Sequence, residues 1–223
     1  MESRTPVGAV AVIGLGTFGA TVAGDLAAFG HHVIGIDVDE RRVDAVADAL
    51  SQAVIADARD EAALEGAGVN QCDACVIAIG EDLEANIVGA MNARTLGVRQ
   101  VWVKSRSRTH RRILQRIGVD HVVTPERDMG HRIAQTIHNP FVTDYMAVAQ
   151  GVSAVSLSAP TRLVGRGLRE LRFAERYRVE CLGLVRAGAL HRLGEDPVIE
   201  EGDAILLLGK RADLQHFGEA TCA

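Results

Sequence analysis

"VIGLGTFGATVAGDL", residues 12–26, sets three glycines between an apolar run and a segment with helical spacing. Gly14, Gly16 and Gly19 spell G-x-G-x-x-G at this junction, which is the context that the dinucleotide-binding fingerprint requires. The first glycine allows a tight turn, the second lets the backbone approach phosphate oxygens, and the third lets the helix pack close to the strand. The helix N-terminus would then present free N–H groups and a partial positive charge to an anion.

Asp37 strengthens this interpretation, because it ends the second apolar run at the offset where an acid binds the ribose hydroxyls. A carboxylate at this position repels a 2′-phosphate, so NAD, ATP or ADP is favoured over NADP. The glycines and the acid together predict that the chain binds an adenine nucleotide. The alternative is a Rossmann scaffold that holds no ligand.

Short β-rich apolar runs alternate with helical segments along the first part of the chain. Six such units in sequence predict an α/β fold, a Rossmann-like doubly wound parallel sheet with helices on both faces. The expected strands are residues 9–14, 32–37, 53–57, 74–80, 100–105 and 120–125, and the expected helices are residues 17–29, 40–50, 60–66, 83–96, 109–117 and 128–138.

The rhythm changes after the segment IHNPF, residues 137–141, where a small α+β module is expected. Its half-buried strands predict that one face of the module packs against a neighbour. We therefore expect a first domain over residues 7–141, which includes a helix at about 126–139, and a second over residues 142–223. The second should contain an extended segment at 145–160, a short helix at 167–177, a hairpin at 179–192 with Gly188 near its turn, a strand at 203–209 and a final helix at 210–220.

Composition narrows the function classes. The chain has 223 residues, is 48% hydrophobic and contains no apolar run of membrane-spanning length, so a cytoplasmic protein is expected. The formal net charge of −5 argues against nucleic-acid binding. The basic stretch at residues 104–116 is either the solvated face of a helix or an anion site at the start of that helix.

Cysteines and histidines do not suggest redox chemistry or a metal centre. Cys72 and Cys75 have the C-x-x-C spacing, but they open an apolar strand and have no helix N-terminus to acidify a thiol. The eight histidines are scattered without metal-ligand spacing.

Further candidate ligand residues lie at the ends of expected strands, where ligands bind in open α/β sheets. Asp57 ends the third strand, and the small residues at 78–80 would let an adenine lie flat against the backbone. Lys104, one of only two lysines in the chain, would supply a compact charge for phosphate, or it is an ordinary surface lysine. Glu126 could hold a cation that bridges phosphates, or it serves the dipole of the helix that follows.

A dehydrogenase would need an acid or base placed near the nicotinamide, and the second module offers no such couple. A nucleotide-binding fold joined to a compact β-rich module instead suits a protein in which a ligand changes how subunits are arranged. The chain is therefore expected not to be an enzyme. The alternatives are an NAD-dependent oxidoreductase and a stand-alone nucleotide-binding interaction protein.

Several segments carry a family resemblance that covers almost the whole chain after about residue 6. The chain resembles the RCK-domain (TrkA-N and TrkA-C) regulatory subunits of Ktr/Trk-type potassium uptake systems, and it is most like the KtrA group. The segments that carry the resemblance are VIGLGTFG, IGIDVDERRV, AVIADARDEAAL, VIAIGEDLEANI, VWVKSRSRTHRRILQRIGVDHVVTPERDMG and RIAQTI in the first part, and GLRELRFAERYRVECLGLVR and GDAILLLGKRADLQHF in the second.

The resemblance implies a cytosolic subunit that binds ATP or ADP, pairs through the helix after the sixth strand and forms an octameric ring. The ring would dock beneath a membrane-embedded potassium-translocating subunit and gate it. Met129, Ile133 and Ile137 would form one apolar face of the pairing helix. The implied nucleotide and cation positions are Gly14, Gly16, Thr17, Phe18, Gly19, Asp37, Asp39, Asp57, Ala78, Ile79, Gly80, Lys104 and Glu126, with Mg²⁺ or another cation at Glu126.

The chain departs from the family pattern at two positions. Where the family loop commonly reads Gly-Arg-Phe-Gly, with the arginine reaching the terminal phosphate of ATP across the dimer, this chain has Thr17. This difference leaves room for NAD or AMP as the ligand. Ala174 stands where relatives that bind cyclic di-AMP have an arginine, so no cyclic dinucleotide is expected in the second module.

Overall fold

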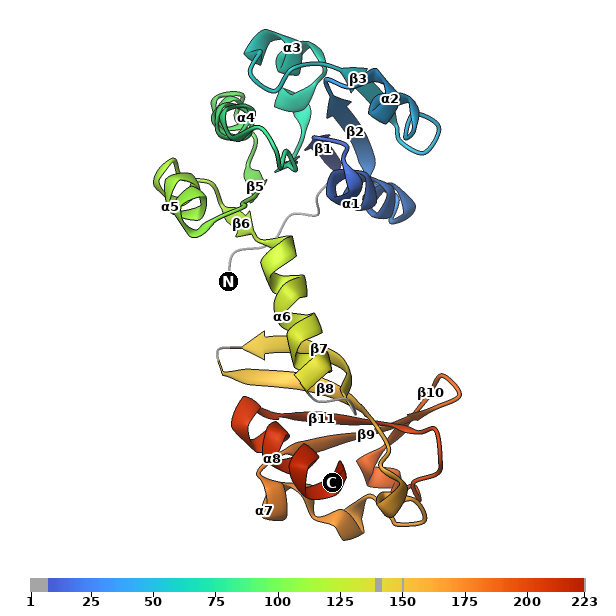
Figure 1. Cartoon of the computed structure of the whole chain (residues 1–223). Coiled ribbons are helices and arrows are strands. Elements are labelled where there is room, and N and C mark those ends of the chain that lie inside the picture. Colours follow the sequence, from blue (N-terminus) through green and yellow to red (C-terminus); the bar gives the residue numbers. More distant parts are fainter. Residues whose placement is uncertain (1–7, 139–141, 150, 223) are drawn as a thin grey trace. The chain divides into compact units, whose positions relative to one another are not determined.

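The computed structural model describes residues 8–138, 142–149 and 151–222, and the chain divides into two compact units, Met1–Glu126 and Arg127–Ala223 (Figure 1). Each unit has its own hydrophobic core. The sequence-based boundary at residue 141 falls outside the described residues and stays a prediction. None of the described helices is long and apolar enough to cross a lipid bilayer.

The first unit contains a six-stranded parallel sheet with strand order β3-β2-β1-β4-β5-β6, which confirms the Rossmann-like prediction. The strand order reverses between β1 and β4, which is where ligands bind in folds of this kind. The strands are β1 (Ala9–Ile13), β2 (His32–Asp37), β3 (Gln52–Ile55), β4 (Ala74–Ile77), β5 (Gln100–Lys104) and β6 (His121–Val123).

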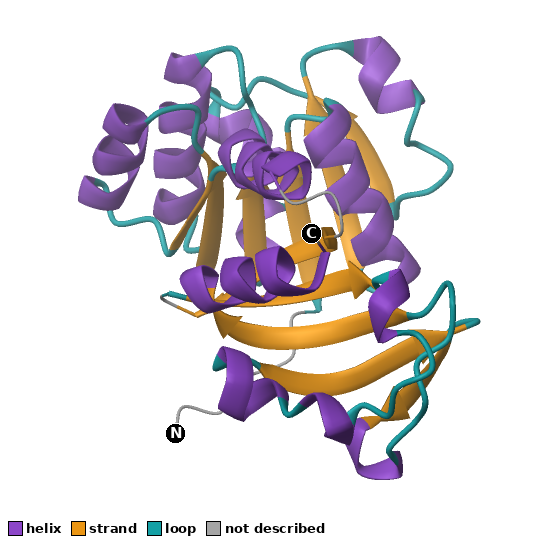
Figure 2. Ribbon diagram, turned by 60° about the horizontal axis from the view of Figure 1, so that its bottom comes forward, coloured by secondary structure: helices purple, strands orange, loops and turns teal. Residues whose placement is uncertain are grey.

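Helices flank this sheet (Figure 2). Side-chain caps fix where most of them begin. Asp39, Asp60, Asp82 and Ser107 each accept a backbone N–H from the first turn of the helix that follows. The helix expected over residues 40–50 is shorter than predicted, because helical geometry ends at Asp44 and gives way to turns. The elements are α1 (Thr17–Ala28), α2 (Glu40–Asp44), α3 (Glu61–Gly66), the 3₁₀ turn η1 (Val69–Gln71), α4 (Leu83–Thr95) and α5 (Arg108–Arg116).

Alternate residues of the central strands point to opposite faces and fill two cores. Val10 and Val12 of β1 pack with Val33 on one face, whereas Ile13 packs with Ile77 on the other. All of these side chains are at most 2% exposed. Full burial of such a side chain contributes about 1.5–3 kcal/mol, so both faces of the sheet stabilise the fold.

The second unit contains an antiparallel sheet with strand order β10-β9-β11-β8-β7. The hairpin predicted around Gly188 is confirmed, with Ala187 and Gly188 at φ values of 48° and 79° in its turn. The strands are β7 (Val142–Ala149), β8 (Val152–Ser158), β9 (Glu180–Arg186), β10 (Ala189–Arg192) and β11 (Ala204–Lys210).

The extended conformation expected over residues 145–160 is confirmed, and it is divided between β7 and β8, which pair with each other as a hairpin with Gly151, at φ 77°, in the connection. One expectation for the second unit was wrong. The single helix expected over residues 167–177 is interrupted at Arg172, whose φ of 47° cannot continue a right-handed helix. A 3₁₀ turn, η3 (Arg169–Leu171), precedes that residue and α7 (Phe173–Tyr177) follows it.

Among the described residues, the remaining α-helices are α6 and α8. α6 (Pro125–His138) begins within the first unit and contains no buried residue. α8 (Arg211–Cys222), which was predicted over 210–220, packs on β11 and buries Phe217 in a core with Leu184 and Ile205. The second unit also contains the 3₁₀ turns η2 (Thr161–Leu163) and η4 (Leu193–Glu195).

Candidate nucleotide-binding site

A crevice of about 780 Å³ opens at the carboxyl ends of the parallel strands. Every residue predicted for the nucleotide site lines it except Gly19 and Asp39. Asp39 instead caps α2 and forms an ion pair with Arg41. The lining residues are Ile13, Gly14, Leu15, Gly16, Thr17, Phe18, Asp37, Val38, Arg42, Ala56, Asp57, Ala58, Arg59, Ala78, Ile79, Gly80, Glu81, Asp82, Ala85, Lys104 and Glu126.

Glycine is needed at the three loop positions for different structural reasons. Gly14 has a φ of +96°, and a Cβ there would lie 2.9 Å from the backbone nitrogen of Ile79. A Cβ on Gly19 would lie 1.8 Å from the carbonyl oxygen of Gly14, so this glycine permits the close approach of helix and turn. A Cβ on Gly16 would meet nothing nearer than Arg42, at 4.0 Å, so the space in front of Gly16 belongs to the crevice.

The N-terminus of α1 faces this space without a capping side chain. Gly16 is the N-cap residue, and the first turn contains no acidic residue. The first N–H groups of a helix have no partner within it, and they carry the positive end of the helix dipole. The helix end at Gly16 and Thr17 therefore has the features that could receive an anion.

Asp37 is buried, with 5% of its surface exposed, and it holds the glycine loop on β2. Its Oδ2 accepts the Leu15 N–H at 2.6 Å and its Oδ1 accepts the Asp39 N–H at 2.9 Å. Arg42 Nη1 lies 3.5 Å from the same Oδ2. A carboxylate has about four acceptor positions, so Asp37 retains capacity for a ribose hydroxyl.

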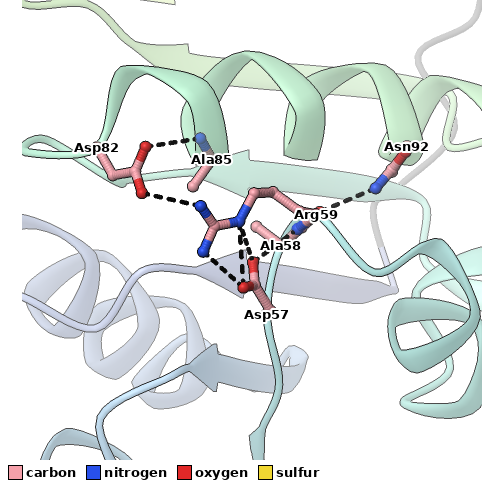
Figure 3. Close-up of polar contacts among 6 residues, drawn as sticks. All are labelled: Asp57, Ala58, Arg59, Asp82, Ala85 and Asn92. Carbon is pink, nitrogen blue, oxygen red and sulfur yellow. Dashed lines mark hydrogen bonds and ion pairs between the residues drawn. The ribbon is translucent and has the colours of Figure 1, made fainter.

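The Asp57 carboxylate is engaged by Arg59, a crevice residue that the sequence analysis missed (Figure 3). Arg59 Nη2 lies 2.7 Å from Asp57 Oδ2, its Nε lies 3.0 Å from Oδ1, and its Nη1 reaches Asp82 Oδ2 at 3.4 Å. These hydrogen bonds from Arg59 hold the pKa of Asp57 below its usual range. The end of β3 therefore presents a tethered guanidinium to the crevice, not a free carboxylate.

The loop that carries Arg59 is fixed against α4. Asn92, a buried residue of α4, donates to the Ala58 carbonyl oxygen at 2.9 Å (Figure 3). A Cβ on Gly89 would lie 2.9 Å from the Ala58 side chain, so glycine allows helix and loop to meet. Asp82 also accepts the Ala85 N–H at 2.9 Å and so caps α4 while it holds Arg59.

Lys104 and Glu126 lie together at the other end of the crevice. Their Nζ and Oε1 atoms are 2.6 Å apart, and the hydrogen bond from Lys104 lowers the pKa of Glu126. The Lys104 side chain is only 13% exposed, and its Nζ lies 5.6 Å from the centre of the Phe18 ring. A phosphate in the crevice would compete with Glu126 for this ammonium.

The remaining ionisable groups give little support for metal or thiol chemistry. Among the residues that the structure describes, no three His, Cys, Asp or Glu side chains gather in a group that could hold a metal ion. Cys72 and Cys75 are free and buried, and burial raises the pKa of the Cys72 thiol to about 11. A cation at Glu126 would therefore need further oxygen ligands, such as those of a bound phosphate.

Comparison with known proteins places the chain in a family. The TrkA-N domain family matches residues 10–125, and the TrkA-C domain family matches residues 152–220. The chain belongs to the TrkA-N/TrkA-C family. It is 35% identical over 209 residues to the Ktr system potassium uptake protein C of Bacillus subtilis, a match that covers 93% of this chain and 94% of the relative.

Other relatives agree with this assignment. The Ktr system potassium uptake protein A of Vibrio alginolyticus is 34% identical over 205 residues, covering 92% of this chain and 93% of the relative. The solved GsuK RCK domain shares the fold, with a TM-score of 0.68 and 14% identity, over 98% of this chain and 48% of that one. The GsuK channel bound to NAD gives a TM-score of 0.64 at 15% identity, covering 95% and 39% of the two chains. The family resemblance expected from the sequence is confirmed.

Proposed function

We propose that this TrkA-N/TrkA-C chain is a nucleotide-sensing regulatory subunit, which binds an adenine nucleotide in the crevice and gates a membrane-embedded potassium-translocating subunit of the Trk/Ktr type. One observation carries the proposal. The crevice combines an uncapped helix N-terminus, a buried strand-end acid and a paired lysine in a chain with Ktr uptake proteins as full-length relatives.

ATP or ADP fits the residues present. The loop at Gly16 and the N-terminus of α1 would receive phosphate, Asp37 would accept from the ribose, and Lys104 would hold the outer phosphates. Val38, an apolar residue that lines the crevice although it is 63% exposed, offers a surface for the base. NAD and AMP remain candidate ligands, because Thr17 supplies no charge for a terminal phosphate.

A divalent cation such as Mg²⁺ belongs to this proposal. The Glu126 carboxylate is 66% exposed and lies beside the ammonium that would meet the outer phosphates. A cation bridging those phosphates to Glu126 would release the carboxylate from Lys104 and complete its own oxygen ligands from the nucleotide. The nucleotide and the cation would then bind cooperatively.

Two exposed apolar surfaces support self-association. Met129, Ile133 and Ile137, spaced along α6, are 50%, 51% and 77% exposed. The first unit separately carries an apolar hollow of about 560 Å³ that includes Phe18, Val22, Leu26 and Trp102. Such surfaces mark interaction sites, so we propose a homodimer through α6 that assembles into an octameric ring beneath its transporter partner, at the inner face of the cell membrane.

The proposal is tested by identifying the nucleotide that the purified protein retains, using mass spectrometry, and by calorimetric titration with ATP, ADP, AMP, NAD and NADP. We expect ATP or ADP to be retained and to bind more tightly than NADP. The regulatory role also predicts that the protein does not oxidise NADH in the presence of 2-oxo acids. A chain that binds no adenine nucleotide at millimolar concentration, or that turns NADH over, would overturn the proposed function.

A further inference from the structure

Asn86 of α4 is fully buried between the ends of two strands that form the crevice wall. Its Nδ2 donates to the carbonyl oxygen of Ile79 at 2.7 Å and to that of Lys104 at 3.1 Å. A side-chain amide has two N–H donors, so both are used by these carbonyls. Asn86 thus joins the backbone at Ile79, next to Gly80, directly to the backbone that carries the Lys104 ammonium.

The strands themselves do not provide this connection. The register of β4 with β5 runs from Ala74 opposite Gln100 to Ile77 opposite Val103. Ile79 and Lys104 lie beyond the last of these pairs, at the level of the crevice. Asn86 therefore replaces the missing ladder bonds at the point where the two strand ends separate to make room for a ligand.

His110 of α5 determines how the Asn86 amide is oriented. Its Nε2 lies 3.1 Å from Asn86 Oδ1, and its Nδ1 accepts the backbone N–H of Arg106 at 3.4 Å. With Nδ1 acting as the acceptor, the proton of the neutral ring is on Nε2, which donates to Oδ1. Burial lowers the pKa of His110 and so favours this neutral ring. The Asn86 amide is held with its Nδ2 toward the two carbonyls.

The hydrogen bonds from Asn86 also affect where the Lys104 side chain can lie. A lysine carries its ammonium on a flexible four-carbon chain, so the position of the ammonium depends on a fixed backbone and on close neighbours. Lys104 Nζ lies 3.3 Å from where a Cβ of Gly80 would be, so the Gly80 backbone is one of these neighbours. The bonds from Asn86 fix both the backbone that carries the ammonium and the backbone beside it.

We propose that Asn86, oriented by His110, is a positioning residue for phosphate recognition in the crevice. It holds Lys104 and the Gly80 backbone at the separation that the outer phosphates of a nucleotide require. This inference rests on the proposed function, since it assumes that the crevice binds nucleotide phosphates. It adds two residues from outside the crevice lining, on two different helices, to the recognition of one ligand.

The test is a double-mutant cycle between Asn86→Leu and Lys104→Met, with dissociation constants measured calorimetrically for ATP and AMP. Asn86→Leu should weaken ATP binding by about tenfold, the effect of losing one well-placed charge-assisted contact. The affinity for AMP, whose single phosphate would lie at the N-terminus of α1, should change by less than about twofold. In the Lys104→Met background, Asn86→Leu should have little further effect on ATP.

A matched control comes from the same helix. Asn92 is also buried on α4 and donates to a carbonyl of a crevice loop, that of Ala58, far from Lys104 in the strand order. Asn92→Leu should lower thermal stability as Asn86→Leu does, but it should change ATP and AMP binding equally. If Asn86→Leu also weakens both ligands equally, or if its effect persists unchanged in Lys104→Met, the positioning role is refuted.

The histidine supplies a second pair of variants if Asn86→Leu does not fold. His110→Gln retains an amide N–H for Asn86 and should bind ATP within about threefold of the wild type, whereas His110→Leu should show the selective loss of ATP affinity. Equal ATP affinities for the two histidine variants would overturn the proposal. A wild-type protein that binds neither ATP nor AMP would refute the proposed function itself, which is a distinct outcome.

Discussion

Two acids of the crevice, Asp37 and Asp57, differ in what their carboxylates are free to do. Asp37 is anchored by two backbone N–H groups and by an arginine at the longer distance of 3.5 Å. Asp57 is held by Arg59 through both of its oxygens and also accepts the N–H of that residue. Asp37 is therefore the acid whose carboxylate can still accept a hydrogen bond from a ribose hydroxyl. Asp57 instead holds the Arg59 guanidinium in place.

Replacing Asp37 with alanine should weaken ATP, ADP and NAD together. The carboxylate would accept hydrogen bonds from the ribose that ATP, ADP and NAD share, and a charge-assisted hydrogen bond contributes about 1.5–3 kcal/mol, or about ten- to a hundredfold in affinity. Titration calorimetry on the wild type and on Asp37→Ala measures this change. Equal affinity of the wild type for NAD and NADP would contradict the role of Asp37, since a 2′-phosphate would face its negative charge.

The preference for ATP over ADP should depend on a divalent cation and on the pair formed by Lys104 and Glu126. With Thr17 in the glycine loop, these two residues are the charged groups predicted to meet the outer phosphates. The ratio of the ADP to the ATP dissociation constant should fall toward one without Mg²⁺, and also in Lys104→Ala or Glu126→Gln. Thr17→Arg should raise the ratio. A ratio that is the same in all of these variants, with and without Mg²⁺, would show that other residues recognise the terminal phosphate.

At the scale of elements, the parallel sheet was predictable because each strand is a short apolar run followed by a helix with its own cap. Local sequence patterns predicted the elements of the second unit less reliably. The helix break at Arg172 requires a left-handed backbone, and the sequence has no glycine at that position to indicate it. The glycine loop and the strand-end residues of the candidate site could be predicted from their positions at the carboxyl ends of the expected strands. Arg42 and Arg59 could not, because their side chains fold back onto Asp37 and Asp57, which lie just before them in the chain, and such contacts leave no periodic signal.

A charged cluster orders the loop that leads into β11. Asp203, 1% exposed, accepts from Nε and Nη2 of Arg186, each at 2.8 Å, and from the Glu200 N–H at 2.8 Å. The hydrogen bonds from Arg186 hold the pKa of Asp203 below its usual range. Because the folded pKa is depressed, the stabilisation is fully present above the ordinary pKa of an unfolded aspartate and is lost as the pH falls through the folded value.

Asp203→Asn should therefore lower the free energy of unfolding of the second unit by about 1–3 kcal/mol at pH 7. Urea denaturation of the wild type and the variant, followed by circular dichroism from pH 7 down to pH 3, measures the difference. The difference should be constant above about pH 5 and should shrink at the acid end. A gap that widened on acidification would mean that Asp203 is not stabilised as the charged form.

At the scale of the whole molecule, the apolar stripe of α6 predicts that the protein self-associates without nucleotide. Light scattering at micromolar concentration should give a mass above that of the monomer, both with and without ATP. Ile133→Asp places a charge in the middle of the stripe and should shift the mass toward the monomer. His131→Asp, at an exposed position on the opposite face of the same helix, is the matched control and should retain the wild-type mass. A monomeric wild type would remove the gating-ring proposal.

Gly16 separates folding from ligand binding in a way that Gly14 and Gly19 do not. Its φ of −66° is ordinary for any residue and no protein atom lies within 4 Å of an added Cβ except Arg42 at that limit, so an alanine there obstructs the crevice without disturbing the fold. Such a subunit would assemble normally but remain silent. Mixed with wild-type subunits in known proportions, it would act as a dominant-negative subunit. Under the proposed function, the dependence of transport activity on the fraction of mutant subunits would show how many nucleotide-responsive copies an assembly needs to open its partner.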